Sequence, residues 1–287
     1  YDLERRRRAA PLEPERLRRM CRALTHRGPD DEGVHLERNL GLAIRRSAPT
    51  APELAKQPVY SESHDTVVVA DSDIFNYRQL RADLQGRGHH FRTDSASEVL
   101  VHLYEAYGLG MLPRLRGSFA FALWDARRER LVLARDRIGI KPLYLANHEG
   151  CLLFASELKS IAQSGLLERH VDALGLHHFL SLGCVPGPSS LLRGVEQLLP
   201  GEYLVCDEGG AQRSRYWHLE FRDEGGPRRS GPGESATSSP SASPFTSWDP
   251  VPWGPSSRRM SSPAPLSDSW PAWSTLPCRH SALLTHS

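Results

Sequence analysis

The chain has 287 residues, with 36 basic and 34 acidic side chains, and its net charge of +2 is too small to indicate a nucleic-acid partner. No apolar run approaches the ~20 residues that cross a bilayer, and no segment has the pattern of a signal peptide, so no membrane partner is expected. The five cysteines are scattered and lack metal-type spacing, which predicts free or buried thiols, no metal site and a cytoplasmic location.

The first predicted element is an amphipathic helix near the start of the chain. Its apolar residues recur at helical spacing, and they are Leu17, Met20, Cys21 and Leu24. Pro14 lies near the start of this pattern, where proline is well tolerated. Because Cys21 belongs to the apolar stripe, we interpret it as a thiol of the core and not as a nucleophile.

Two further elements precede the middle of the chain. Residues 67–70 form a short apolar run that predicts a buried strand. Ser95 and Glu98 have the spacing of a capping box, and apolar residues at helical spacing follow them. The sequence therefore predicts a second helix, with Val99, Leu100, Leu103, Tyr104 and Tyr107 on its apolar side.

The second half of the domain is predicted to begin with a hairpin. Residues 119–124 and 131–134 are apolar runs of strand length, and the charged residues 125–130 between them form the turn. The later elements are a strand at 151–155, a helix at 171–182 and a strand at 203–206. Mixed helices and strands over about 220 residues indicate one domain with a sizeable core.

Several motifs occur in a fixed order between about Tyr1 and Phe221. The longest is GSFAFALWDARRERLVLARDRIGIKPLY, residues 117–144. The others are His26–Gly33, Asp73–Tyr77, Phe154–Lys159, Leu182–Pro188 and Leu199–Tyr203. Together they resemble the type-2 glutamine amidotransferase (glutaminase) domain of asparagine synthase, a domain of the N-terminal-nucleophile type. The resemblance implies an α+β fold with four layers, in which two stacked antiparallel sheets lie between helical layers.

The tail, residues 222–287, differs from the domain at 1–221. Ser and Pro make up about two-fifths of the tail, and without helical or alternating periodicity it cannot offset its ordering entropy. One interpretation is a disordered extension. The other is a frameshift, because the codons of Pro252 to Arg258, read one base earlier, permit Val-Gly-Ala-Phe-Leu-Ser after a proline. In the resembled family that peptide leads into the pyrophosphate-binding loop of a synthetase domain, which the tail would then replace.

The resemblance also implies how glutamine is hydrolysed. The nucleophile is an N-terminal cysteine, and its free α-amino group activates the thiol. The family pattern opens with Met-Cys-Gly-Ile, whereas this chain opens with Tyr1-Asp2-Leu3. We therefore assign no catalytic residue here, interpret the chain as incomplete at both ends, and expect no glutaminase activity from it as given.

The expected glutamine pocket departs from the family pattern. Asp71, Ser72 and Asp73 align with the family's Asn-Gly-Glu loop, whose Asn amide and Gly N–H stabilise the oxyanion. An ionised Asp71 only accepts hydrogen bonds, and losing one oxyanion donor costs about 2.7–4 kcal/mol. Ser72 keeps a backbone N–H, and Asp73 keeps an acid on a shorter arm. Ala96 replaces a second acid that holds the α-amino group, while Arg46 aligns with the clamp of the α-carboxylate.

Two functions remain open. The first is a glutaminase-domain fragment of an asparagine synthase-like amidotransferase, in which glutamine-derived ammonia reacts with an ATP-activated carboxylate and converts aspartate to asparagine. The second is a non-catalytic structural or interaction domain of a synthetase that uses free ammonia. The resemblance implies glutamine as a small-molecule substrate and leaves room for a homodimer. It places ATP and Mg in the synthetase domain and no cofactor in this chain.

Overall fold

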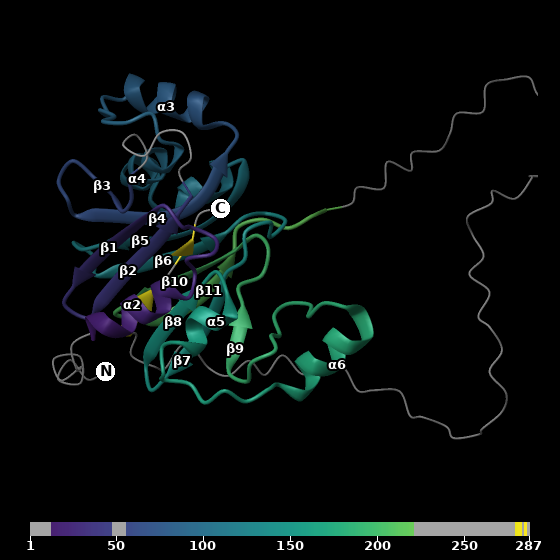
Figure 1. Ribbon diagram of the computed structural model, residues 1–287. Helices are drawn as coiled ribbons and strands as arrows, with labels where there is room; N and C mark the ends of the chain where they lie inside the picture. The colour runs from purple at the N-terminus through teal and green to yellow at the C-terminus, as the bar shows by residue number, and fades with distance from the viewer. Residues whose placement is uncertain (1–12, 48–55, 221–278, 283, 286–287) are drawn as a thin grey trace, which may run out of the picture. The chain divides into compact units, whose positions relative to one another are not determined.

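The computed structural model describes residues 13–47, 56–220, 279–282 and 284–285, and Figure 1 shows their arrangement. Its largest sheet has six strands in the order β11-β10-β6-β5-β4-β3, and every neighbouring pair is antiparallel. The strands are β3 (Val59–Tyr60), β4 (Thr66–Ile74), β5 (Gly117–Asp125), β6 (Arg130–Arg135), β10 (Glu202–Asp207) and β11 (Gly210–Arg215). The predicted hairpin is confirmed as β5 and β6.

A second layer of strands contains two smaller sheets. One has the order β1-β2-β13 and the other the order β12-β8-β7-β9. Their strands are β1 (Asp31–Glu37), β2 (Leu40–Arg46), β7 (Tyr144–His148), β8 (Cys151–Ala155), β9 (Val195–Gln197), β12 (Arg279–Ala282) and β13 (Leu284–Thr285). β12 pairs in parallel with β8, and β13 pairs in parallel with β2. One short stretch near the C-terminal end thus hydrogen-bonds to both sheets.

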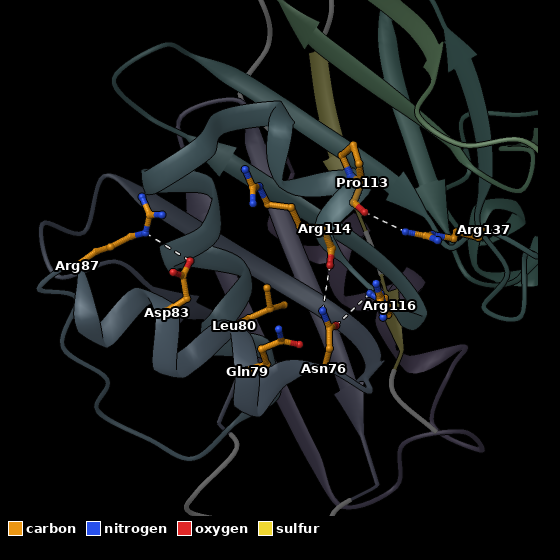
Figure 2. A pocket seen from close by; sticks show the side chains of 9 residues that line it. All are labelled: Asn76, Gln79, Leu80, Asp83, Arg87, Pro113, Arg114, Arg116 and Arg137. Carbon is orange, nitrogen blue, oxygen red and sulfur yellow. Dashed lines mark hydrogen bonds and ion pairs between the residues drawn. The ribbon is translucent and has the colours of Figure 1, made fainter.

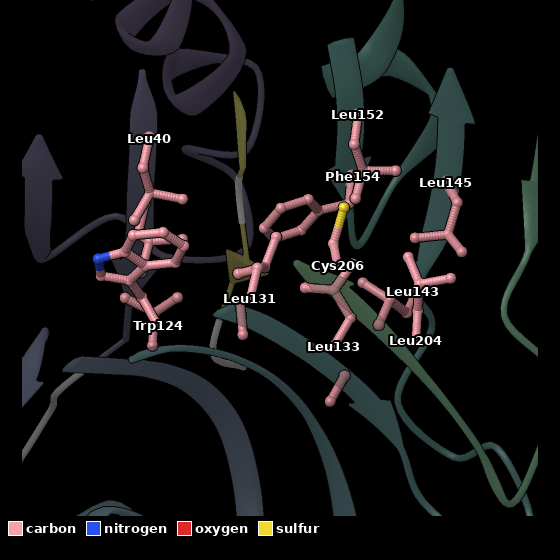
Figure 3. Close-up of a cluster of buried hydrophobic side chains, with 14 of the residues drawn as sticks. Leu40, Trp124, Leu131, Leu133, Leu143, Leu145, Leu152, Phe154, Leu204 and Cys206 are labelled. Carbon is pink, nitrogen blue, oxygen red and sulfur yellow. The ribbon is translucent and has the colours of Figure 1, made fainter. Parts of the chain in front are cut away.

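Three clusters of buried side chains hold four layers together. The cluster between the two strand layers contains Leu42, Phe154 and Leu204, and Figure 3 shows it from close by. The outer face of the six-stranded sheet packs against α3 (Tyr77–Gly86), α4 (Ala96–Tyr107) and the 3-10 helix η1 (Gly108–Arg114). The outer face of the second layer packs against α2 (Pro14–Arg22) and α5 (Leu158–Ala162). The predicted α+β class with four layers is confirmed.

The run of four apolar residues in β4 reflects burial on both faces of its sheet. Successive side chains of a strand point to opposite faces, and here Val67 and Val69 join the cluster between the layers. Val68 and Ala70 join the cluster under α4. The same alternation continues into the polar residues that follow, which fixes the direction of each.

Helix α4 begins as predicted, but its capping box does not form. The side chain of Ser95 accepts a hydrogen bond from the backbone N–H of Ser97 at 3.3 Å. Glu98 instead accepts from the backbone N–H groups of Arg92 and Thr93, at 2.6 and 2.8 Å. The buried carboxylate of Glu98 therefore fastens the loop before α4 to the helix.

Of the predicted helices, α6 (Ala173–Leu182) buries the fewest of its residues. Asp172 caps its first turn by accepting from Gly175 N–H at 2.8 Å. Gly175 is the one buried residue of the helix. Several large apolar side chains of α6 are exposed, and these are Leu174, Leu176, Phe179, Leu180 and Leu182.

The cysteines are partly as predicted. Cys21 is fully buried, and burial, followed by the charge of Glu32, raises the pKa of its thiol to about 12, which confirms a core thiol. Cys184 is an exposed free thiol. The expectation of thiols throughout is wrong at Cys206, which is disulfide-bonded. Sequence spacing does not reveal such a bond, because the pairing of cysteines depends on the fold.

The predicted tail falls largely outside the described residues. Of residues 222–287 the structure describes 279–282 and 284–285, which are the strands β12 and β13. The boundary at 221, the frameshift interpretation of 252–258 and the start of the chain therefore stay predictions. Within the described ranges, no helix is long and apolar enough to cross a membrane.

Candidate glutamine site

Three of the predicted site residues follow one another at the end of β4. Asp71 and Ser72 are buried, whereas the side chain of Asp73 is 59% exposed. Because side chains alternate along a strand, Asp71 and Asp73 share a face. Ser72 points the other way, and its Oγ lies 3.5 Å from the Oγ of Ser97 on α4.

Asp71 lies between two cationic side chains. Lys141 Nζ is 2.7 Å from Oδ1 of Asp71, and Arg27 Nη2 is 3.5 Å from Oδ2. Both contacts are ion pairs with the Asp71 carboxylate. Asp71, which the sequence predicts at an oxyanion-donor position, is therefore an acceptor that two cationic side chains already engage.

Lys141 bridges the two aspartates of β4. Its Nζ also lies 3.4 Å from Oδ2 of Asp73. Burial by itself lowers the pKa of Lys141, but the hydrogen bond and charge of Asp71, with those of Asp73, outweigh it and raise the pKa. Lys141 is thus held as a charged ammonium group beside the predicted pocket.

The loop that presents Lys141 is fixed by Asp136. This fully buried carboxylate accepts hydrogen bonds from the backbone N–H groups of Ile138 and Ile140 through Oδ1, at 3.1 and 3.0 Å. Through Oδ2 it accepts from Lys141 N–H at 3.0 Å and from Phe119 N–H at 3.3 Å. One side chain therefore satisfies the donors of a whole loop.

Arg135 holds the same loop from its carbonyl side. Its guanidinium donates to the carbonyl oxygens of Lys141, Leu198 and Gly139, at 2.8, 2.6 and 2.9 Å. Gly139 has φ +72°, and a Cβ there would lie 2.8 Å from Pro200 Cγ. These contacts explain why charge, glycine and lysine occur together in residues 135–141.

Arg46, the predicted carboxylate clamp, lies on β2 and is 4% exposed. Its Nη1 donates to Asp31 Oδ2 at 3.1 Å. The neighbouring backbone packs tightly against Gly28, where an added Cβ would lie 2.4 Å from the nitrogen of Arg46. Gly28 follows Arg27, whose guanidinium reaches Asp71 on β4.

Glu157 extends the cluster of charges beyond Arg27. Its Oε1 lies 3.7 Å from Arg27 Nε and 3.1 Å from His26 Nε2. Its Oε2 lies 3.1 Å from Lys159 Nζ. Charged residues from three of the resembling motifs, at 26–33, 117–144 and 154–159, therefore meet within one cluster.

Sequence reasoning predicted Arg46, Asp71, Ser72 and Asp73, and missed the groups that engage them. Lys141 and Arg27 are the missed residues. The sequence did contain a signal, because both residues lie in the motifs given above. Each is close to a glycine, Gly28 or Gly139, where an added Cβ would clash. The order of motifs along the chain does not show which of them meet, because those contacts form only in the fold.

The described surface also has a hollow at a different place. It has a volume of 460 Å³, and it is lined by Asn76, Gln79, Leu80, Asp83, Arg87, Pro113, Arg114, Arg116 and Arg137 (Figure 2). Most of its arginines are engaged: Arg87 with Asp83, Arg137 with the carbonyl of Pro113, and Arg114 over the ring of Tyr107. It shares no lining residue with the charged cluster around Asp71, so we do not place the glutamine site there.

Comparison with known proteins identifies the fold's relatives. A family model described as "Glutamine amidotransferase domain" matches residues 5–217. The chain is 33% identical over 211 residues to asparagine synthetase [glutamine-hydrolyzing] 3 of Bacillus subtilis, covering 72% of this chain and 34% of that protein. It is 32% identical over 214 residues to amidase chry2 of Gibberella zeae, covering 73% and 31%.

Among solved structures, a glutamine phosphoribosylpyrophosphate amidotransferase from B. subtilis aligns with a TM-score of 0.43 at 19% identity. The alignment covers 59% of this chain and 34% of that chain. The chain spans about a third of the length of the curated relatives that it matches. The comparisons therefore concern one domain of longer proteins.

Proposed function

This chain belongs to the glutamine amidotransferase domain family, and from that premise we propose that it is the glutaminase end of an asparagine synthase-like amidotransferase whose pocket no longer hydrolyses glutamine. In such an amidotransferase, ammonia released from glutamine reacts with a carboxylate that ATP has activated, and aspartate becomes asparagine. ATP and Mg belong to the synthetase part of that reaction. This domain would supply the glutamine site.

The observation that carries the proposal is the ion pair between Asp71 and Lys141. Attack on the glutamine amide places negative charge on its oxygen, and preorganised donors must face that charge. Asp71 aligns with the family's Asn donor, and Lys141 and Arg27 engage its carboxylate. Its carboxylate would repel the oxyanion at the moment of reaction.

Glutamine binding is expected to be weak but not abolished. Arg46 retains a fork of donors that suits an α-carboxylate, although Asp31 now competes for it. The half-exposed Asp73 is the acid left to hold the α-ammonium group, because Ala96 offers no charge. A pocket with these groups retains ground-state contacts while it lacks transition-state stabilisation.

A non-catalytic interaction domain is the second candidate, and helix α6 favours it. Five large apolar side chains of α6 are exposed, with Leu180 at 76%. Exposed apolar surface of this kind commonly marks a contact with another domain or protein. Such a contact would tie this domain to a synthetase half that uses free ammonia. The cytoplasmic location and a homodimer stay predictions.

The discriminating experiment is a glutaminase assay on a version with Cys-Gly-Ile-Ala-Gly-Ile added before Tyr1. Ammonia and glutamate release should stay near the level of a denatured control, and Asp71→Asn in the same version should raise it. Brisk hydrolysis with Asp71 unchanged would overturn the proposal. No hydrolysis in either version, together with loss of partner binding in Leu180→Glu, would favour the interaction domain.

A further inference from the structure

We propose that His89, His102 and Glu105 form a binding site for a divalent transition-metal ion of the Zn²⁺ class. His102 and Glu105 lie one turn apart on the same face of α4, and His89 comes from the loop after α3. The site lies outside the charged cluster around Asp71. It thus adds a function that the glutaminase proposal does not require.

The spacing of the three ligand atoms fits a metal ion. His89 Nδ1 and His102 Nδ1 are 3.3 Å apart, and His102 Nδ1 is 3.2 Å from Glu105 Oε2. The third side, from His89 Nδ1 to Glu105 Oε2, is 3.7 Å. Tetrahedral Zn²⁺ with bonds of about 2.0–2.1 Å has ligand atoms about 3.3–3.4 Å apart. The three atoms therefore outline one face of such a tetrahedron.

Hydrogen bonding alone satisfies this arrangement poorly. A neutral imidazole carries one hydrogen, and a hydrogen on Nδ1 of His102 can point at His89 or at Glu105 but not at both. A metal ion accepts the lone pairs of both imidazoles and the carboxylate at once. The donor set of two imidazoles and one carboxylate is a common zinc set with a fourth position for water.

The surroundings orient His102 in the way that metal-bound histidines are oriented. Its second nitrogen, Nε2, faces the buried carboxylate of Glu98 at 3.8 Å. Carboxylates on the far nitrogen fix the ring and raise its basicity as a ligand. Phe91 also packs on the ring, with a centroid separation of 4.5 Å. The side chain of His102 is 3% exposed, whereas those of His89 and Glu105 are 21% and 29% exposed, so the site is open to an ion from solvent.

Occupation of the site would fasten the loop of residues 87–95 to α4. That loop is already attached through Glu98, which accepts from Thr93 Oγ1 at 2.6 Å. Position 96, where the family has an acid for glutamine, follows directly. A bound metal would therefore give the segment before α4 a second attachment to the helix, besides the one through Glu98. The cysteine spacing gave no sign of this site, because no cysteine takes part.

The test is zinc titration of the full 287-residue chain by calorimetry and thermal unfolding, in parallel with His89→Ala, Glu105→Gln and His90→Ala. His90 is the matched control, because it is an exposed histidine next to the site that contributes no ligand. The chain's other histidines and cysteines also bind zinc, so the quantity measured is the difference between variants. We expect wild type and His90→Ala to share one high-affinity site and a rise in melting temperature.

His89→Ala and Glu105→Gln should each weaken that site at least tenfold while keeping their metal-free melting temperatures close to wild type. Co²⁺ should give the visible absorption of a tetrahedral ion in wild type and not in either variant. Equal zinc affinity in wild type, His89→Ala and Glu105→Gln would overturn the proposal. So would a loss of affinity in His90→Ala that equals theirs.

Discussion

Lys141 Nζ lies 2.7 Å from Oδ1 of Asp71, and each residue is at most 7% exposed. Two charges that leave water together must compensate one another, since an isolated buried charge costs several kcal/mol. The pair is thus a single energetic unit. Removing the charge of one member leaves the other as a buried charge without its main partner, which lowers the stability of the fold. This relationship governs both the stability of the domain and the chemistry available in its pocket.

Removing the charge of either member of the pair should destabilise the domain, but the two losses should differ in size. Lys141→Met leaves buried Asp71 with Arg27 at 3.5 Å and should cost about 3–5 kcal/mol. Asp71→Asn should cost less, because Lys141 retains Asp73 at 3.4 Å. The double variant should be more stable than Lys141→Met. Urea midpoints measure this, with Asp94→Asn as a surface control. Additive losses in the double variant would contradict a coupled pair.

Restoring catalysis should need changes at two positions. In the version that carries the added cysteine, Asp71→Asn should act mainly on kcat by supplying an oxyanion donor. Ala96→Asp should act mainly on KM, because the α-ammonium contact is equal in the ground and transition states. Steady-state ammonia release separates the two effects. If Asp71→Asn alters mainly KM and Ala96→Asp alters mainly kcat, the assignment of these residues is wrong.

Removing the carboxylate of Asp136 should release the loop that carries Lys141. Asp136→Ala leaves backbone N–H groups at residues 119, 138, 140 and 141 without their acceptor. We expect a loss of roughly 3 kcal/mol or more in the free energy of unfolding, and faster hydrogen exchange at those amides. Asp207→Ala, on a partly exposed ion pair with Arg130, is the control and should cost about 1 kcal/mol or less. An equal loss in both variants would contradict this role.

Alkaline pH should destabilise the fold through Cys21 and Tyr104. Burial raises the pKa of Cys21 from 9.0 to about 12, and burial with the charge of Asp125 raises that of Tyr104 from 10.0 to about 12. The unfolded chain loses these protons first, so stability is complete below about pH 9 and falls as the pH rises toward 12. Urea midpoints at about pH 8 and pH 10.5 measure the loss, which should be smaller in Cys21→Ala. Cys184→Ala, an exposed free thiol, should behave like wild type.

Limited trypsin digestion should cut first between Arg222 and Arg259. The core up to about residue 221 should resist, because its backbone is hydrogen-bonded in stacked sheets. The fragment that carries β12 and β13 should co-purify with the core after the cut, since both strands pair with it. Cutting first inside residues 119–134, or a resistant tail, would contradict the predicted boundary.

The fold was predictable from sequence where one strand or helix carried its own signal. Residues 67–70, 119–124 and 151–155 are apolar because both faces of their strands are buried, and each is a strand. The two-residue strand β3 and the exposed face of β1 carry no such pattern, and sequence reasoning missed them.

The sequence predicted only those site residues that align with the pattern of the resembled family. Asp71 and Asp73 stand next to an apolar run, so their places on β4 followed from the strand. Their engagement by Lys141 depends on a loop held by Asp136 and Arg135, whose partners are distant in the sequence. The pairing of Cys206 and the convergence of His89 with His102 likewise exist only in three dimensions.

The parallel strands β12 and β13 also impose an order on folding. Their partners, β8 and β2, are made before them, and a long stretch of chain separates Arg279 and Leu284 from those partners. Contacts this distant in sequence form late, because closing the intervening loop costs entropy before any pairing repays it. Until then, the edges of β2 and β8 that accept these strands remain open to other chains. Aggregation should therefore be greater before β12 and β13 have paired than after.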